Sequence, residues 1–188
     1  NAGNVDVIHT FDSLEEVYRL GLEALGREFQ ILARATNTCD VKLDGSVKSD
    51  NRDEFISFIK ERIDKGYPCI ALGIIGPPEA CIITGYRENG AVLLGWNFFQ
   101  DISGFSSGVR IDDSGYFITD KWWNNGNTVA VISIGEITGG RMSSKNILEN
   151  AVRVMTGRLV RKSDKTFAKG IMAYDAWKKA ILNESEFP

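Results

Sequence analysis

Three closely spaced apolar segments at the centre of the chain constrain its fold most. They are residues 69–75 (CIALGII), 80–86 (ACIITGY) and 91–96 (AVLLGW). Pro77 and Pro78 form a rigid turn between the first two, and residues 87–90 (RENG) fit a hairpin turn between the second two. Because connections this short join antiparallel neighbours, the sequence predicts an antiparallel meander.

Helices are predicted on both sides of this strand-rich centre. Apolar residues recur at helical spacing in four segments, residues 13–25, 53–65, 143–155 and 167–182. Further strands are predicted at residues 5–11, 29–33, 116–119 and 128–134, and polar, turn-rich loops at residues 36–52 and 97–115. This segregation predicts an α+β fold, with a central antiparallel sheet and helices from both chain ends packed around it.

Length and charge limit the domain count and the partners. A chain of 188 residues is long enough for one core, which predicts a single domain over residues 1–188. It begins at Asn1 without a methionine, which favours a fragment of a longer protein. The formal net charge of −3 gives no general attraction to nucleic acids or anionic membranes. No segment reaches the roughly 18 apolar residues that a membrane span needs, so we expect neither nucleic acid nor membrane as a partner.

Cysteine and histidine are few, with three and one in the chain. Cys39, Cys69 and Cys81 are widely separated and odd in number, which favours free thiols in a reducing, cytoplasmic compartment. Cys69 and Cys81 lie in apolar strand segments, where a free cysteine behaves as a small hydrophobic residue. His9 has two interpretations. It is either a catalytic base, paired with Cys39 or with an acidic residue, or a polar residue at a strand edge. No partner residue lies at a suitable spacing, which favours the strand-edge interpretation. One histidine excludes a His-rich zinc site, and we expect no cofactor or metal.

Two sequence motifs resemble a known family. Residues 67–96 (YPCIALGIIGPPEACIITGYRENGAVLLGW) resemble the central hairpin of papain-like, C39-type cysteine peptidase folds. Residues 172–181 (MAYDAWKKAI) are similar to the last helix of uncharacterised bacterial relatives of the butirosin-biosynthesis H N-terminal domain. The resemblance covers roughly residues 53–182, and it implies a papain-like arrangement of the sheet and helices.

The resemblance also implies where catalytic groups would stand. Glu79 occupies the position of the catalytic histidine, and Asn97 falls near the position of the orienting Asn or Asp. The nucleophilic cysteine of this family starts a helix upstream of the hairpin, but the helices predicted there start near Ser13 and Asp53. A carboxylate beside a thiol raises the thiol pKa, so Glu79 is a poor replacement for an imidazole. The resemblance therefore implies a peptidase frame without its nucleophile and base.

Aromatic side chains around the hairpin are candidates for a binding pocket. They are Trp96, Phe98, Phe99, Tyr116, Trp122 and Trp123, interleaved with the amides of Asn97, Asn124 and Asn125. These residues either line a pocket or fill the core. Two adjacent tryptophans in an alternating strand cannot both face one core, which keeps the pocket open as an interpretation. The predicted binding residues are Glu79, Trp96, Asn97, Trp122 and Trp123.

These patterns favour a non-catalytic, papain-like domain. We expect it to bind a small-molecule ligand or a partner protein in a cleft between the central strands and the N-terminal helices. The alternative is part of a cysteine-dependent hydrolase or acyltransferase whose nucleophile lies outside this chain. The sequence specifies no oligomeric state.

Overall fold

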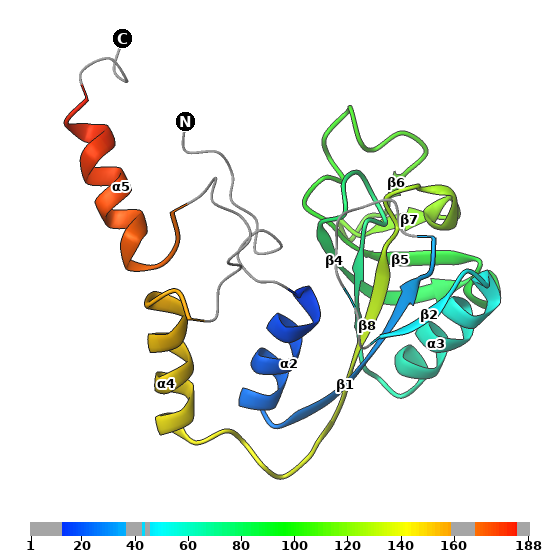
Figure 1. The fold of residues 1–188 in the computed structure, drawn as a ribbon. Helices are drawn as coiled ribbons and strands as arrows, with labels where there is room; N and C mark the ends of the chain where they lie inside the picture. The colour runs from blue at the N-terminus through cyan, green and yellow to red at the C-terminus, as the bar shows by residue number, and fades with distance from the viewer. Residues whose placement is uncertain (1–12, 37–42, 44–45, 159–167, 184–188) are drawn as a thin grey trace.

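One eight-stranded sheet forms the centre of the computed structural model, which describes residues 13–36, 43, 46–158 and 168–183 (Figure 1). The described helices are α2 (Leu14–Ala24), α3 (Arg52–Asp64), α4 (Ser144–Met155) and α5 (Ile171–Ile181). The strands are β1 (Arg27–Arg34), β2 (Val47–Ser49), β3 (Cys69–Leu72), β4 (Ala80–Arg87), β5 (Val92–Trp96), β6 (Arg110–Ile111), β7 (Phe117–Thr119) and β8 (Ala130–Ile137). Two 3₁₀ turns, η1 (Glu88–Gly90) and η2 (Trp122–Asn124), complete the set. The strand predicted at residues 5–11, with His9, lies outside the described residues.

The predicted meander is present, and a distant strand extends it. The strand order is β2-β1-β8-β3-β4-β5-β7-β6, and every neighbouring pair is antiparallel except β1 and β2. The β4–β5 hairpin turns at η1, where Asn89 has a left-handed φ of 56°. Strand β8 lies between β1 and β3, so Ile132 pairs with Ile31 on one side and with Ile70 on the other. The α+β class with helices around a sheet is therefore confirmed.

The sheet separates two hydrophobic cores, one on each face. Alternation along β8 sends Val131 into one core and Ile132 into the other. Helix α3 covers the first face and buries Phe55 there, and α2 covers the second face and buries Leu14. Figure 1 shows these two helices on opposite sides of β1.

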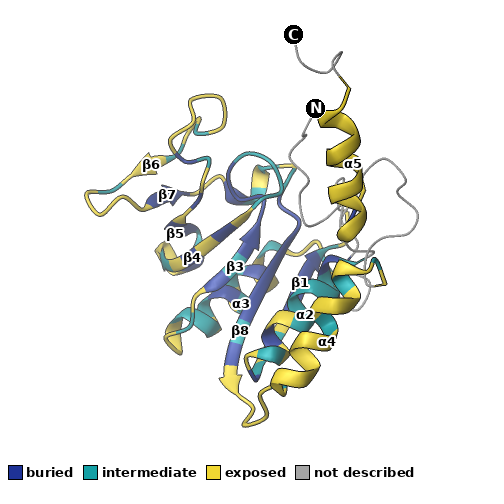
Figure 2. Ribbon diagram, turned by 90° about the vertical axis from the view of Figure 1, so that its left-hand side faces the viewer, coloured by how far each residue is buried: buried dark blue, intermediate teal, exposed yellow. Residues whose placement is uncertain are grey.

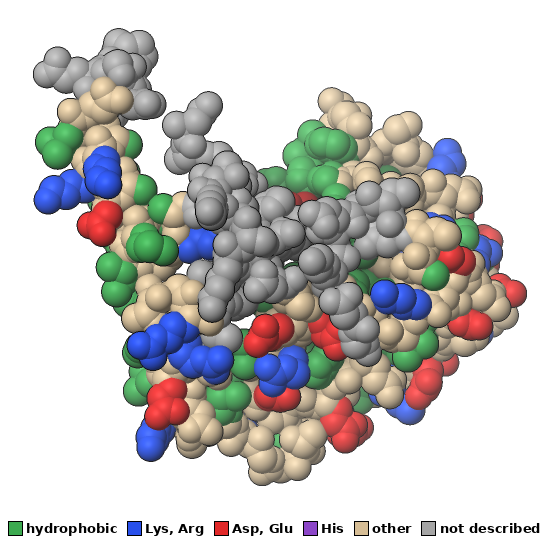
Figure 3. Space-filling model, in the orientation of Figure 1, with side chains coloured by type: hydrophobic (Ala, Val, Ile, Leu, Met, Phe, Trp, Pro, Cys, Tyr) green, Lys and Arg blue, Asp and Glu red, His purple; other side chains and the backbone are tan. Residues whose placement is uncertain are grey.

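The two helices that follow the sheet bury no residue. Figure 2 shows α4 and α5 exposed along most of their length. Their apolar side chains remain at the surface, as Figure 3 shows over α5. Examples are Leu148, Val152 and Met155 in α4 and Ile171, Tyr174 and Trp177 in α5. The core thus depends on α2 and α3. None of the described helices is long and apolar enough to span a bilayer.

Two predicted loops contain short strands, and one predicted strand is shorter than expected. β2 lies within residues 36–52 and β6 within residues 97–115, because two or three residues can pair through their main chains without an apolar alternation. β3 ends at Leu72 instead of residue 75, since Gly73 takes a φ of 76° that a strand cannot continue.

Candidate functional site

The five predicted binding residues do not share one cavity. Asn97 and Trp122 are buried, with 1% and 0% of their surfaces exposed, whereas Trp96 is 50% exposed on β5. Glu79 is partly buried in the loop between β3 and β4. Among the described residues, none of the five lines the β1 cavity of about 430 Å³, the two cavities of about 340 Å³ or the one of about 410 Å³ beside α3. Their role in binding stays a prediction.

Trp122 and Trp123 belong to one core and not to opposite faces of a strand. They lie in η2, where neighbouring side chains are about 120° apart because the turn has 3.0 residues per turn. Their rings meet edge to face at 5.5 Å, and Trp123 also contacts Phe55 at 5.0 Å. Trp122 Nε1 donates to the Ala91 carbonyl at 3.2 Å. The prediction that Trp122 and Trp123 lie in an alternating strand was therefore wrong, since the backbone at this point is a 3₁₀ turn.

Asn97 holds a turn after β5. Its Oδ1 accepts the Phe99 N–H at 2.7 Å, and its own N–H donates to Gln100 Oε1 at 3.0 Å. The Asn97 amide also lowers the pKa of the Cys81 thiol, although the buried Asn97 Nδ2 makes no hydrogen bond within the described residues. Asn97 thus stabilises a buried bend next to a cysteine.

The two described cysteines are buried and free. Burial raises the pKa of Cys81 to about 12, a larger effect than the lowering by the Asn97 amide and the Ala71 and Ile74 backbone. Burial likewise raises the pKa of Cys69 to about 12, against a smaller lowering by Arg62. Both thiols are protonated at neutral pH, and their behaviour as small hydrophobic residues is confirmed. Cys39 lies outside the described residues.

The loop of residues 73–79 is held by main-chain and amide hydrogen bonds. The Gly73 N–H donates to the Glu79 carbonyl at 3.1 Å, so the backbone of Glu79 closes the loop. Asn125 Nδ2 donates to the carbonyls of Gly73 and Gly76 at 2.7 and 3.2 Å, and Asn127 Nδ2 donates to that of Gly76 at 2.8 Å. A cavity of about 340 Å³ lies beside this loop, lined by Asn124, Asn125 and Asn127 among others. The amides of Asn125 and Asn127 are thus already bonded to the loop.

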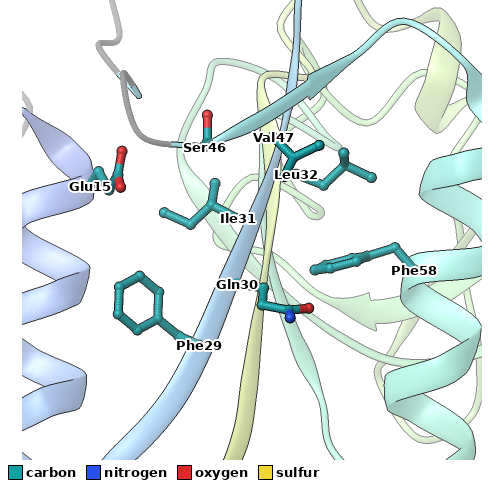
Figure 4. A pocket seen from close by; sticks show the side chains of 8 residues that line it. All are labelled: Glu15, Phe29, Gln30, Ile31, Leu32, Ser46, Val47 and Phe58. Atoms are coloured by element: carbon teal, nitrogen blue, oxygen red, sulfur yellow. The ribbon is translucent and has the colours of Figure 1, made fainter.

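An apolar groove of about 430 Å³ lies along β1, between α2 and α3. We call it the β1 groove. It is lined by Glu15, Phe29, Gln30, Ile31, Leu32, Ser46, Val47 and Phe58. Figure 4 shows Phe29 and Ile31 on the α2 side of β1, and Gln30 and Leu32 on the α3 side with Phe58. The edge of β1 therefore forms the floor of the groove, and the two faces of the sheet continue into its walls.

The groove exists because β2 covers only part of β1. The pairing runs from Leu32 with Val47 to Arg34 with Ser49. Just before β2, the Ser46 N–H and Oγ both donate to the Leu43 carbonyl, at 3.4 and 2.6 Å, and close a turn. Leu43 is buried in the core on the α2 side. Sequence reasoning missed the site, because residues 29–33 fit a fully buried strand and residues 36–52 fit a loop.

Neither a metal site nor a comparison with known proteins assigns a function to the chain. Within the described residues, no group of three or more His, Cys, Asp and Glu side chains is arranged to hold a metal ion. No family model, curated protein or solved structure matches the chain.

Proposed function

We propose that the protein is a non-catalytic binding domain and that the β1 groove holds its ligand or partner protein. The observation that carries this proposal is an apolar groove of about 430 Å³ with a strand edge at its floor. Its size falls in the range of about 300–1,000 Å³ that is usual for binding sites. Phe29, Ile31 and Phe58 supply apolar walls, and the Glu15 carboxylate and Gln30 amide supply polar groups.

The state of the cysteines supports the non-catalytic part of the proposal. Cysteine catalysis requires a thiolate. Burial raises the pKa of both Cys69 and Cys81 to about 12, so neither supplies a thiolate at pH 7. We include the papain-like, C39-type relationship in the same proposal. Glu79 stands at the position of that family's catalytic histidine, so the relationship also implies a non-catalytic domain. Free thiols at both described cysteines also support a reducing, cytoplasmic setting.

Amide NMR with small apolar probes tests the binding site. Indole and cyclohexanol should shift the resonances of Phe29, Ile31 and Val47, which lie on the groove. Val47→Glu places a charge at the exposed rim and should weaken probe binding about tenfold. Ile111→Glu is the matched control, because Ile111 is an exposed apolar strand residue on β6, at the opposite edge of the sheet.

Two results would contradict the proposal. Shifts that avoid the β1 groove, or that Val47→Glu leaves unchanged, would remove the groove as the site. Hydrolysis of a peptide or a thioester that disappears in Cys39→Ala would show that the domain is catalytic.

A further inference from the structure

The main-chain groups of β1 alternate between β8 and the β1 groove. The Arg34 N–H donates to the Val129 carbonyl at 2.8 Å, and the Gln30 N–H donates to Ser133 Oγ at 3.2 Å, so both point toward the β8 side. On the other side, the Ala35 N–H donates to the Ser49 carbonyl at 3.3 Å. Because alternate residues of a strand direct their N–H and C=O groups to opposite edges, those of Phe29 and Ile31 point toward the groove.

No described strand pairs with β1 on the groove side of residues 27–30, and at Ile31 the parallel pairing with β2 already uses the carbonyl, which faces the Val47 N–H. The β2 pairing begins at Leu32 and Val47. Main-chain donors and acceptors at such an edge need hydrogen-bond partners from water or from another strand. The β1 groove therefore presents a row of main-chain groups between two apolar walls.

We propose that the β1 groove binds an extended peptide of a partner protein, which adds to β1 as a new strand beside residues 27–31. This inference rests on the proposed function and specifies its ligand class. A strand satisfies the Phe29 main chain and the Ile31 N–H, and its alternate side chains reach the α2 wall and the α3 wall in turn. A small apolar molecule would fill the walls and leave the edge without protein partners.

Charge around the groove specifies the peptide further. Glu15 stands on the α2 side, and the adjoining surface of α3 carries Asp53, Glu54 and Glu61. Of these, Glu61 is paired with Lys65 at 2.8 Å. Most of these carboxylates therefore lie on the α3 side, where Arg62 also donates to Gln30 Oε1 at 2.9 Å. The peptide that fits is apolar at the alternate positions that face Phe29 and Ile31 on the α2 side, and it carries Lys or Arg at the positions that face the α3 carboxylates.

Hydrogen exchange of individual amides, measured by NMR, tests the inference. The probe is a capped heptapeptide of alternating Val and Lys, and its control is the same peptide with each central amide N-methylated. In the free protein, the Phe29 and Ile31 amides should exchange at least about tenfold faster than those of Gln30 and Leu32. The peptide should slow both outward amides about tenfold, and the N-methylated control should leave them unchanged.

A pair of variants separates main-chain pairing from side-chain contact. Phe29→Pro and Phe29→Ala both remove the ring, but the proline variant also removes the outward N–H. Phe29→Pro should bind the peptide more weakly than Phe29→Ala. If the proline variant does not fold, the N-methylated peptide still tests whether binding depends on main-chain hydrogen bonds. Amides that are already protected in the free protein, or peptide binding that N-methylation does not weaken, would overturn the inference. If indole binds the groove and the peptide does not, only the inference fails, and if neither binds, the proposed function fails too.

Discussion

Replacing Gly73 with alanine should destabilise the fold more than the same replacement at a loop glycine that has no neighbouring atom near the new Cβ. Gly73 ends β3 with a φ of 76°, and a Cβ at this position would lie 1.8 Å from the main-chain oxygen of Asn127. The same glycine makes three hydrogen bonds. Its carbonyl accepts from Asn125 Nδ2 at 2.7 Å and from Thr128 Oγ1 at 2.9 Å, and its N–H donates to the Glu79 carbonyl at 3.1 Å.

The expected loss combines backbone strain with broken hydrogen bonds. Alanine in the left-handed region costs about 1–2 kcal/mol. The contact of 1.8 Å joins a Cβ, which is fixed to the main chain, to the main-chain oxygen of Asn127. No side-chain rotation can relieve it, so the end of β3 has to move away from Asn127. That movement weakens two or three hydrogen bonds, each worth about 1 kcal/mol. We therefore expect Gly73→Ala to lower the free energy of unfolding by about 3–5 kcal/mol.

Gly66→Ala provides the matched control. Gly66 has a φ of 82°, but no heavy atom lies within 4 Å of a Cβ built there. Its expected cost is the strain alone, about 1–2 kcal/mol. Urea unfolding followed by tryptophan fluorescence measures both variants, because Trp122 is buried and its carbonyl accepts from Thr128 Oγ1 at 2.7 Å. Equal losses in the two variants, within about 1 kcal/mol, would refute the reasoning that the Asn127 contact dominates.

Two further predictions concern helix caps and thiols. Asn51→Ala should lower the free energy of unfolding by about 1 kcal/mol, because Asn51 caps the packed helix α3. Ser143→Ala removes a similar cap from α4 but should lower only the helical circular-dichroism signal, since α4 buries no residue. Folding raises the pKa of Cys69 and Cys81 from 9.0 to about 12, so their contribution to stability is complete below pH 9 and is lost as the pH rises toward 12. Cys81→Ala should reduce the alkaline slope of stability, measured by urea unfolding, by about 1.4 kcal/mol per pH unit, and an unchanged slope would contradict this.

The local part of the fold could be predicted from the sequence, and the long-range part could not. The β3–β4–β5 meander follows from three apolar segments with short turns between them. The helices α2 and α3 follow from apolar periodicity. In contrast, the position of β8 between β1 and β3 depends on which distant strands pair, and periodicity contains no information about that choice. β2 and β6 were also missed, because their few residues are held by main-chain pairing.

The candidate site was harder to predict for a different reason. Trp122, Trp123 and Asn97 were predicted as binding residues because they have large or polar side chains close to the hairpin that resembles a known family. The structure uses Trp122 and Asn97 inside the core, where a 3₁₀ turn and a buried bend need them. The strand edge at Phe29 and Ile31 consists of main-chain groups, which every residue has. Which of these groups lack a partner in the described strands depends on where β2 begins, at Val47.

The two helices beside β1 determine what this edge can accept. An exposed strand edge normally invites another sheet to pair with it, and proteins usually block such edges with charges, prolines or bulges. At the β1 groove, α2 and α3 stand on the two sides of the edge, as Figure 4 shows. A second sheet whose faces are covered by helices would bring those helices against α2 or α3 before the edges met. A single extended chain has no such layers and can enter between the helices. The arrangement therefore leaves the edge open to a peptide and closes it to edge-to-edge pairing with a helix-covered sheet.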